Sequence, residues 1–593
     1  MSSPYPIQDR SGLARVVPLV GWLRHYDRKI LRHDLVAGLT VAVMLVPQSM
    51  AYATLAGMPP VTGLYASIVP LVVYALLGTS GSLAVGPVAI TALMTSAALA
   101  GRADGDPARY AALAALLALL VGGIQVLLGV LRLGVLVNFM SHPVLSGFTS
   151  AAAIVIAASQ VKDLFGLNMG RAETFPEIVA ALWGAATTAH GLTILVSLVS
   201  VAALVLLRRY APRLPGALLV VAGVTAVSAA FSFGDRGVKI LSYVPAGLPV
   251  PALPTLSGQD VQALLPAAIA IALVAYLEGI AVAKTLAAKS RQQVGPDREL
   301  VAVGAANLSA GLFQAFPVAG GLSRSAVNFS AGARTPVATL VTAAMVAVTA
   351  LVLTPAFHHL PRAVLAAIVV VAVLGLVDRK GAATTWRVRR ADGLALALTF
   401  LVTLLVGVEP GLAAGVAFSL GVFVWRSARP HTAELGRVPD TDRYRNVQRF
   451  PGLLTDPRFA VVRVDGPLYF ANAQRLSDQL LTMAGQRAGL VAIVLDASAI
   501  TDIDTDGATA MAELRERLAG HDVVLHLATV RGPVRDLLDR AGVWRSVRDA
   551  GHVHPDIPTA LAAAEGTAAF AADGDRATFA MAGSSTDDTR EVR

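Results

Sequence analysis

The chain contains no cysteine and few charged or aromatic residues. Its 593 residues include 15% Asp, Glu, Lys and Arg and 6% aromatic side chains. The absence of Cys excludes disulfides, thiol catalysis and thiolate metal sites. A soluble protein of this size carries nearer a quarter charged residues, so the 55% hydrophobic content indicates a membrane protein embedded in a lipid bilayer.

The net charge of +9 is spread over short loops between apolar runs. Nucleic-acid binding needs clustered positive charge, so we expect no nucleic-acid partner. Lys and Arg concentrate in the cytoplasmic loops of membrane proteins. Residues 1–34 are polar and basic and contain no cleavable signal, so we expect a cytoplasmic N-terminal segment.

Apolar runs that can cross a bilayer recur along residues 35–428. A span needs about 20 apolar residues, or fewer where a helix is broken. We predict about fourteen spans, which places both termini in the cytoplasm of a cell (inner) membrane protein. Residues 165–190 predict an amphipathic surface helix, with a further span as the alternative. The predicted spans are 35–55, 61–78, 83–100, 110–130, 143–162, 191–208, 214–232, 262–284, 299–315, 322–331, 336–354, 361–377, 391–407 and 410–426.

The first predicted span carries a proline and a glutamine near its middle, Pro47 and Gln48. Proline removes a backbone donor, and glutamine places an uncharged hydrogen-bonding group at membrane depth. Interrupted helices of this kind form the binding sites of secondary transporters. A tolerated kink between packed helices is the alternative.

Two short segments, at residues 79–90 and 317–332, occupy corresponding places in the two halves of the chain. The first contains Gly86 and Pro87, and the second is rich in Gly and contains Arg324. A matched pair of such segments predicts an inverted-repeat transporter with half-helices at its site. Two helix N-termini facing each other attract an anion, and Arg324 adds a full positive charge. A helix break packed against its neighbours is the alternative for each segment.

From about Trp22 to residue 565 the chain resembles the sulfate permease (SulP) family, the bacterial relatives of the animal solute carrier 26 anion transporters. The resemblance is strongest over Asp34 to Ile90, which includes the stretch VPQSMAYA. It implies fourteen spans in two inverted seven-span repeats, divided into a core and a gate domain. It also implies a cytoplasmic STAS domain, a homodimer, and sulfate, bicarbonate or a dicarboxylate as the anion. The residues that it assigns to the anion pocket are Gln48, Tyr52, Val85, Gly86, Val88, Ser323, Arg324 and Ser325.

Glu278 lies in an apolar run in which Lys284 is the only other charged residue. A carboxylate at this depth is unfavourable unless it is paired, protonated or functional. The family resemblance implies that an acidic residue here couples transport to a cation, and a structural pair with Arg324 is the alternative. We expect H⁺ symport ahead of Na⁺ symport, for which Thr285 is a further candidate ligand. Lys284 and Lys289 are expected to snorkel.

After Arg429 charges become frequent and apolar runs shorten, so residues 429–566 predict a small α/β domain. Strands are predicted at Phe459–Val464, Leu490–Leu495 and Val523–Ala528, and helices at Ala473–Ala484, Gly507–Ala519 and Val534–Ala541. This part resembles a STAS domain, which implies a cytoplasmic partner. Its signalling relatives carry a phosphorylated Ser where this chain has Asp506, so Thr505 is the remaining candidate; a plain helix cap at Asp504 is the alternative. Residues 567–593 predict a disordered tail.

The overall prediction is a secondary active anion transporter that uses no cofactor beyond a coupling H⁺ or Na⁺. Alternatives are an anion exchanger, a passive anion channel, a nucleobase permease and a membrane-anchored regulator that acts through its STAS domain. An enzyme is not expected, because His358 and His359 have no matching ligands and no nucleophile–base set is present.

Overall fold

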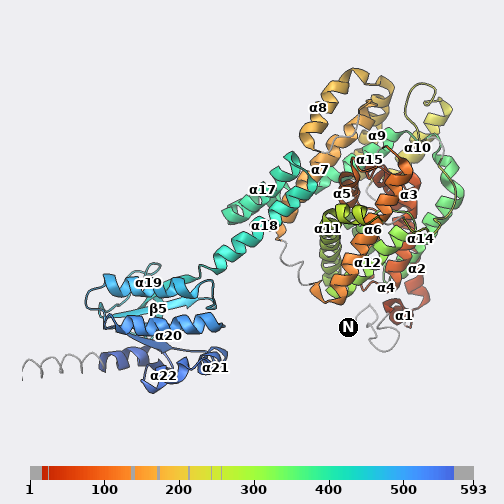
Figure 1. Ribbon diagram of the computed structural model, residues 1–593. Coiled ribbons are helices and arrows are strands. Elements are labelled where there is room, and N and C mark those ends of the chain that lie inside the picture. Colours follow the sequence, from red (N-terminus) through yellow and green to blue (C-terminus); the bar gives the residue numbers. More distant parts are fainter. Residues whose placement is uncertain are drawn as a thin grey trace, which may run out of the picture. The chain divides into compact units, whose positions relative to one another are not determined.

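The computed structural model describes residues 17–566, with gaps at 25, 104, 135–140, 170–173, 212–213, 242–243, 255–256 and 291. The predictions for residues 1–16 and for the tail 567–593 therefore lie outside the described residues. The chain separates after Leu420 into two compact units. The first is helical and the second contains a sheet (Figure 1).

Every predicted span coincides with at least one helix of the first unit. Within the described residues, eight helices are long and apolar enough to cross a membrane, and α5 and α10 are shorter apolar helices. The count of fourteen spans stays a prediction. The helices are α1 (Pro18–Leu23), α2 (Arg28–Leu55), α3 (Pro60–Tyr65), α4 (Val69–Leu77), α5 (Ala89–Leu99), α6 (Pro107–Val130), α7 (His142–Phe165), α8 (Phe175–Ala185), α9 (Gly191–Tyr210), α10 (Gly216–Ala230), α11 (Gly258–Ser290), α12 (Pro296–Leu312), α13 (Leu322–Ser330), α14 (Val337–Val348), α15 (Arg362–Val373), α16 (Arg379–Val388), α17 (Arg390–Leu405) and α18 (Val408–Ser427).

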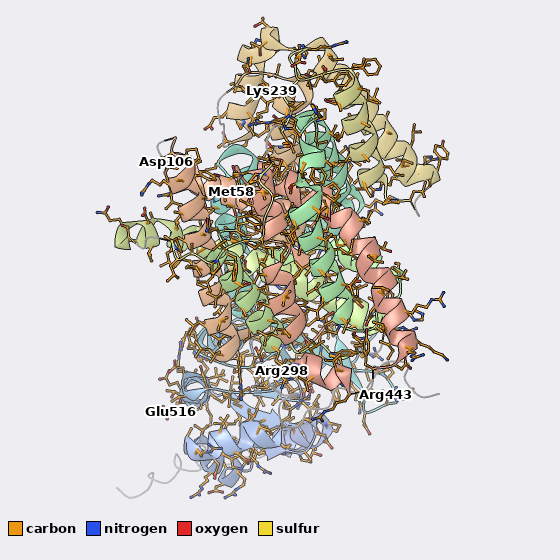
Figure 2. The ribbon with its side chains drawn as sticks, turned by 90° about the vertical axis from the view of Figure 1, so that its right-hand side faces the viewer. Met58, Asp106, Lys239, Arg298, Arg443 and Glu516 are labelled. Carbon is orange, nitrogen blue, oxygen red and sulfur yellow. The ribbon has the colours of Figure 1, made fainter. Side chains whose placement is uncertain are left out.

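The helices pack in two groups. In one, α6 packs on α11 and α12, and α2 packs on α3, α13 and α14. In the other, α7 packs on α15 and α17, and α9 packs on α10 and α15. The groups meet where α2 contacts α15 and α5 contacts α7. In Figure 2, Lys239 lies near one end of the helical unit and Arg298 near the other, and Asp106 and Met58 lie between them.

The prediction that Pro47 interrupts the first span is wrong. Helix α2 continues from Arg28 to Leu55 with Pro47 inside it. One reason is close packing beside the proline: a Cβ on Gly63 of α3 would overlap with the Ser49 carbonyl, so the two backbones touch. Such tertiary contacts outweigh the local preference of proline for a helix end.

Residues 174–185 form the predicted surface helix, α8. Thr174 and Glu177 form a capping box at its N-terminus, which satisfies two backbone donors. Of its residues only Ile178 and Ala185 are buried, and Trp183 is 87% exposed.

The second unit is a six-stranded sheet with strand order β4-β3-β5-β6-β7-β8. Strands β5 to β8 are parallel, and β3 and β4 are antiparallel additions at one edge. Alternate residues face opposite sides, so Val462, Ile493 and Leu525 share one core cluster while Val461 and Val494 join another. The elements are β3 (His431–Arg437), β4 (Tyr444–Asn446), β5 (Phe459–Asp465), α19 (Ala473–Gln486), β6 (Ala492–Asp496), α20 (Thr505–Ala519), β7 (Val524–Ala528), α21 (Gly532–Arg540), α22 (Val543–Asp549) and β8 (Val553–His554).

The three strands and three helices predicted for this unit are confirmed to within a few residues. The sequence did not predict β3, β4, β8 or α22. Three of these four elements are short, and the polar residues in β3 hide its alternation. The small α/β fold predicted after the helical membrane part is therefore confirmed.

Candidate functional site

The two short segments meet in an antiparallel strand pair. Strand β1 (Val85–Gly86) pairs with β2 (Ala319–Gly320), and the Gly321 amide donates to the Ala84 carbonyl at 2.9 Å. Helices α5 and α13 begin directly after these strands, and neither N-terminus has a side-chain cap. The matched segments thus meet where two helices begin, and no side chain caps the first amides of either helix; that these amides bind an anion stays a prediction.

Arg324 lies beside this strand pair, 2% exposed. Its Nη1 donates to the Pro87 carbonyl at 2.7 Å, which ties α13 to the start of α5. Its Nε and Nη2 are buried without a hydrogen-bond partner. Buried polar atoms are nearly always paired, and a guanidinium binds oxyanions with two nitrogens at once. Arg324 can therefore donate two further hydrogen bonds to an oxyanion.

Glycines make room for this guanidinium. A Cβ on Gly321 would lie 2.8 Å from Nη2 of Arg324, and one on Gly86 would lie 3.3 Å from it. Gly86 also has a φ of +153°, a conformation that other residues rarely adopt. On the opposite side, a Cβ on Gly320 would lie 2.7 Å from the Cα of Gly279, so α11 packs directly on β2.

The other predicted residues of these segments have different surroundings. Val85 is buried within β1, and Val88 is the N-cap of α5. Ser323 is exposed on α13. Ser325 links the two segments by hydrogen bonds: its hydroxyl accepts from the Ala84 amide at 2.9 Å and donates to the Gly321 carbonyl at 2.7 Å. Its single proton is thus in use, so Ser325 has no donor for an anion.

Gln48 and Tyr52 lie one turn apart on one face of α2, as predicted. This helix reaches the strand pair, since a Cβ on Gly86 would lie 3.8 Å from Leu45 Cδ1. Tyr52 is 6% exposed, and the charges of both Arg324 and Glu278 act on it. Among the described residues, neither the Gln48 amide nor the Tyr52 hydroxyl has a hydrogen-bond partner.

Glu278 lies on α11 beside the contact between Gly279 and Gly320. Its Oε2 is buried without a partner, and it forms no ion pair with Arg324 within 4.0 Å, although the two charges attract each other. The alternative of a direct structural pair is therefore not borne out. Thr285 is exposed, lies about 10 Å along the helix, and donates its hydroxyl to the Ala281 carbonyl. This spacing disfavours one sodium ion held by both side chains.

Buried polar side chains that the sequence reading missed hold the strand pair in place. Asn307 is fully buried; its Oδ1 accepts from the Val318 amide at 2.7 Å, and its Nδ2 donates to the Val318 carbonyl at 3.0 Å and to Gln125 Oε1 at 3.0 Å. Gln125 in turn donates to the Ala272 carbonyl of α11 at 3.0 Å. A side-chain amide inside each of two predicted spans was the signal that could have identified them.

Two buried carboxylates fix the flanking loops. Glu299 accepts from the backbone and hydroxyl of Thr79, each at 2.6 Å, and from the Tyr74 hydroxyl at 2.9 Å. Asp34 accepts from the Arg334 amide at 2.7 Å and from Thr335. Because each carboxylate lies more than two hundred residues from its loop, the partners could not be predicted from sequence.

No group of three or more His, Cys, Asp and Glu among the described residues could hold a metal ion. His358 and His359 form a T-shaped ring pair with their centroids 4.7 Å apart. In the second unit, Asp504 is the N-cap of α20 and accepts from the Gly507 amide at 2.7 Å. The cap predicted as the alternative is thus present, and Thr505 and Asp506 are exposed on the first turn.

Comparison with known proteins gives the same assignment for both units. Residues 31–399 match the sulfate permease family, and residues 451–560 match the STAS domain. A probable sulfate transporter of Mycobacterium tuberculosis is 39% identical over 553 residues, which cover 92% of this chain and 97% of that protein. The murine solute carrier 26 member A9 anion transporter, solved in the inward-facing state, matches with a TM-score of 0.88 and 26% identity over 94% of this chain and 96% of that one.

The transmembrane domain of a cyanobacterial bicarbonate transporter, BicA, matches with a TM-score of 0.58 and 25% identity. The match covers 66% of this chain and 98% of that one. The lower share of this chain reflects the comparison with a transmembrane domain alone.

Proposed function

Since this chain belongs to the sulfate permease family of anion transporters, we propose that it carries sulfate across a membrane together with a proton. It is a multi-pass membrane transporter and not an enzyme. Sulfate is favoured because the family description and the mycobacterial relative both name it. The chain would work in the cell (inner) membrane with both termini in the cytoplasm, since its loop charges follow the positive-inside pattern.

The proposed anion site lies between the uncapped N-termini of α5 and α13. The observation that carries the proposal is the pair of unpartnered nitrogens on buried Arg324. A tetrahedral oxyanion can accept from both nitrogens and from the first amides of the two helices at once. Gln48 and Tyr52 would supply neutral hydrogen bonds from α2, and Ser323 would add a hydroxyl.

Glu278 would carry the coupling proton. An ionised Glu278 repels a bound anion and attracts Arg324, whereas a protonated Glu278 leaves Arg324 free to bind the anion. Anion and proton therefore favour each other's binding, and this linkage acts equally in both directions. A membrane carrier with such linkage moves both ligands together.

Transport would proceed by movement of the core group of helices, which contains α2, α5, α11 and α13, against the gate group around α7 and α15. The exposure of Ser323 at the site, and of Thr285 two turns beyond Glu278 on α11, supports a path from the site toward the cytoplasm. The similarity to an inward-facing structure supports the same orientation. A homodimer and a partner bound by the STAS domain are further expectations of this proposal.

Radiolabelled sulfate uptake by the purified full chain in proteoliposomes tests the function. We expect uptake that is competed by other oxyanions, increases with an inward proton gradient and does not require Na⁺. Arg324→Gln should abolish uptake. Arg324→Lys should retain part of the uptake, because lysine keeps the positive charge but cannot bind an oxyanion with two nitrogens at once. Full uptake by Arg324→Gln would contradict the proposed site.

Bicarbonate is the second candidate, and the match to the bicarbonate transporter carries it. Bicarbonate is planar, and two of its oxygens can accept hydrogen bonds from one guanidinium, as those of a carboxylate do. Competition decides between the two: if bicarbonate displaces labelled sulfate at a lower concentration than unlabelled sulfate does, and uptake requires Na⁺, the sulfate and proton assignments are both wrong.

A further inference from the structure

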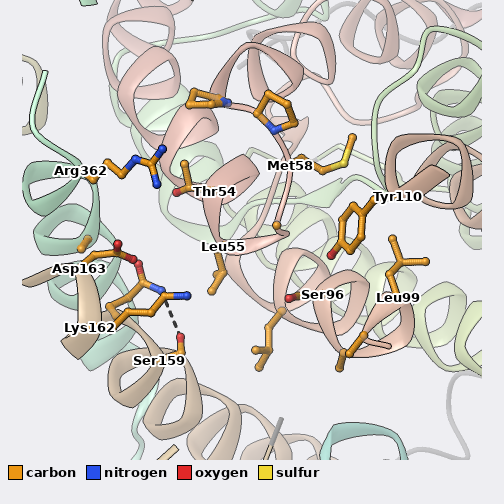
Figure 3. A pocket seen from close by; sticks show the side chains of 18 of the residues that line it. Thr54, Leu55, Met58, Ser96, Leu99, Tyr110, Ser159, Lys162, Asp163 and Arg362 are labelled. Carbon is orange, nitrogen blue, oxygen red and sulfur yellow. Dashed lines mark hydrogen bonds between the residues drawn. The ribbon is translucent and has the colours of Figure 1, made fainter. Parts of the chain in front are cut away.

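A cavity of about 840 Å³ is lined by Met58 and Asp106, which lie away from Arg298, toward Lys239, in Figure 2. Both helix groups line it. Thr54 and Leu55 come from the C-terminal end of α2 and Ser96 from α5, while Lys162 and Asp163 come from α7 and Arg362 from α15 (Figure 3).

Two free cations lie on the α7 and α15 wall of this cavity. Among the described residues, neither the Lys162 ammonium nor the Arg362 guanidinium has a hydrogen-bond or ion-pair partner. Asp163 lies between them and interacts with both charges, but at more than salt-bridge distance. Nearby Lys239 does not add a third free cation, because its ammonium donates to the Leu167 carbonyl at 3.1 Å and to Asn168 Oδ1 at 2.7 Å.

The opposite wall offers little to a cation. The one acidic residue lining it, Asp106, uses Oδ1 to accept from the Ala108 amide at the start of α6, at 2.8 Å. The remaining polar groups there are uncharged, and Figure 3 shows the Ser96 and Thr54 hydroxyls beside the cavity. The wall formed by α7 and α15 therefore carries two positive charges and the one negative charge of Asp163, so its net charge is positive.

The cavity continues the two helices that form the proposed anion site. Thr54 follows Tyr52 by half a turn on α2, and Ser96 lies seven residues beyond the first residue of α5, or about 10 Å along its axis. Leu93, 8% exposed, lies on α5 between the first residue of that helix and Ser96. An apolar side chain therefore lies on α5 between this cavity and the proposed anion site.

We propose that this cavity is an outer vestibule in which Lys162 and Arg362 collect a small oxyanion before it reaches the site at Arg324. The inference rests on the proposed function and adds a second anion-binding subsite to it. Asp163 holds the two cations on one wall while no anion is bound. Because Arg362 and Lys162 belong to the gate group and Leu93 and Ser96 to the core group, movement between the groups would widen the passage past Leu93.

The natural absence of cysteine gives a direct test in the full chain. Ser96→Cys places one thiol in the vestibule, and Thr187→Cys places one on the exposed turn after α8 as the reference. Membrane-impermeant anionic and cationic methanethiosulfonates are applied from outside, and the ratio of their rates reports the local potential. Because local charge changes association rates by about ten- to a thousandfold, we expect the anionic reagent to be favoured about tenfold at position 96 relative to position 187.

Variants that remove the charges of Lys162 and Arg362 then test whether these two residues produce the positive potential at position 96. Arg362→Gln with Lys162→Gln should bring the rate ratio at position 96 to that at position 187, whereas Arg362→Lys should leave it in place. Sulfate should slow modification of the thiol at position 96 when Lys162 and Arg362 are present, and it should have no such effect when both are replaced by Gln. If Ser96→Cys does not react, Ala97→Cys replaces it, and failure of both thiols to react from outside would overturn the proposal.

The proposal would also be overturned if the ratio of anionic to cationic modification rates at position 96 equalled that at position 187. The same holds if replacing Arg362 and Lys162 by Gln left the ratio at position 96 unchanged. The measurement needs no transport, so it fails separately from the proposed function, which fails when uptake is absent. In uptake assays Arg362→Gln should raise the KM for external sulfate about threefold or more with little change in the maximal rate, as expected for a capture site ahead of the transport site.

Discussion

Replacement of Asn307 by leucine tests whether the strand pair at the site depends on a buried amide. Leucine has a similar volume but no polar atoms, so the substitution removes the hydrogen bonds to Val318 and Gln125 without leaving a large cavity. It leaves the Val318 amide, the Val318 carbonyl and Gln125 Oε1 buried and unpaired. At about 1–3 kcal/mol for each of the three unsatisfied groups, the loss is about 3–9 kcal/mol in the free energy of unfolding.

The same change should reduce transport, because Val318 directly precedes β2 and thereby positions Arg324. We expect the apparent Tm in lipid nanodiscs to fall by several degrees and sulfate uptake to fall at least about tenfold. Ser309→Ala on the same helix is the matched control. It removes only a hydroxyl that donates to the Ala306 carbonyl within α12, so Tm and uptake should stay near those of the natural chain.

A double-mutant cycle with Gln125→Leu adds a second check. The two amides share a hydrogen bond, so the double variant should lose less stability than the sum of the two single variants. Stability and uptake in Asn307→Leu equal to those of Ser309→Ala would refute the assigned role of Asn307.

Three further perturbations have expected outcomes. Gly86→Ala should lower uptake about tenfold, since it strains the backbone and crowds Arg324 Nη2, whereas Gly123→Ala, whose Cβ meets no atom within 4 Å, should leave uptake unchanged. Burial, followed by the charges of His552 and His554, lowers the pKa of His526 to about 4, so the folded domain binds fewer protons than the unfolded chain between pH 6.5 and 4. The free energy of unfolding of this domain should therefore fall by about 2 kcal/mol as pH falls from 7 to 5, and His526→Gln should make it less dependent on pH. The assay measures, at each pH, the urea concentration at which the full-length protein becomes sensitive to protease within residues 429–566. Asp504→Ala should cost about 1 kcal/mol by the same assay through loss of the α20 cap, and Thr505→Ala should be near neutral; equal effects would show that the cap is not what stabilises this turn.

The sequence predicted those parts of the fold that depend on local pattern. Long apolar runs located the helices, and alternation of short apolar runs with helical stretches located β5, β6 and β7. Gly86, Pro87 and the glycines before Arg324 indicated two helices that begin inside the membrane part. Each of these signals lies within about twenty residues.

Features that leave no repeating pattern in the sequence were not predictable. Helix α2 continues through Pro47 because α3 packs against it at Gly63. The strand pair consists of two-residue strands, too short for any periodicity. Ser325 was expected to donate to an anion, but its proton goes to the Gly321 carbonyl.

The central claim is that Glu278 couples anion movement to a proton. The most direct measurement is sulfate accumulation by full-length protein in proteoliposomes with a lower pH outside than inside, for the natural chain and for Glu278→Gln. We predict that the natural chain concentrates sulfate in proportion to the proton gradient, and that Glu278→Gln exchanges sulfate across the membrane without concentrating it. Accumulation by Glu278→Gln that follows the proton gradient as in the natural chain would contradict the account.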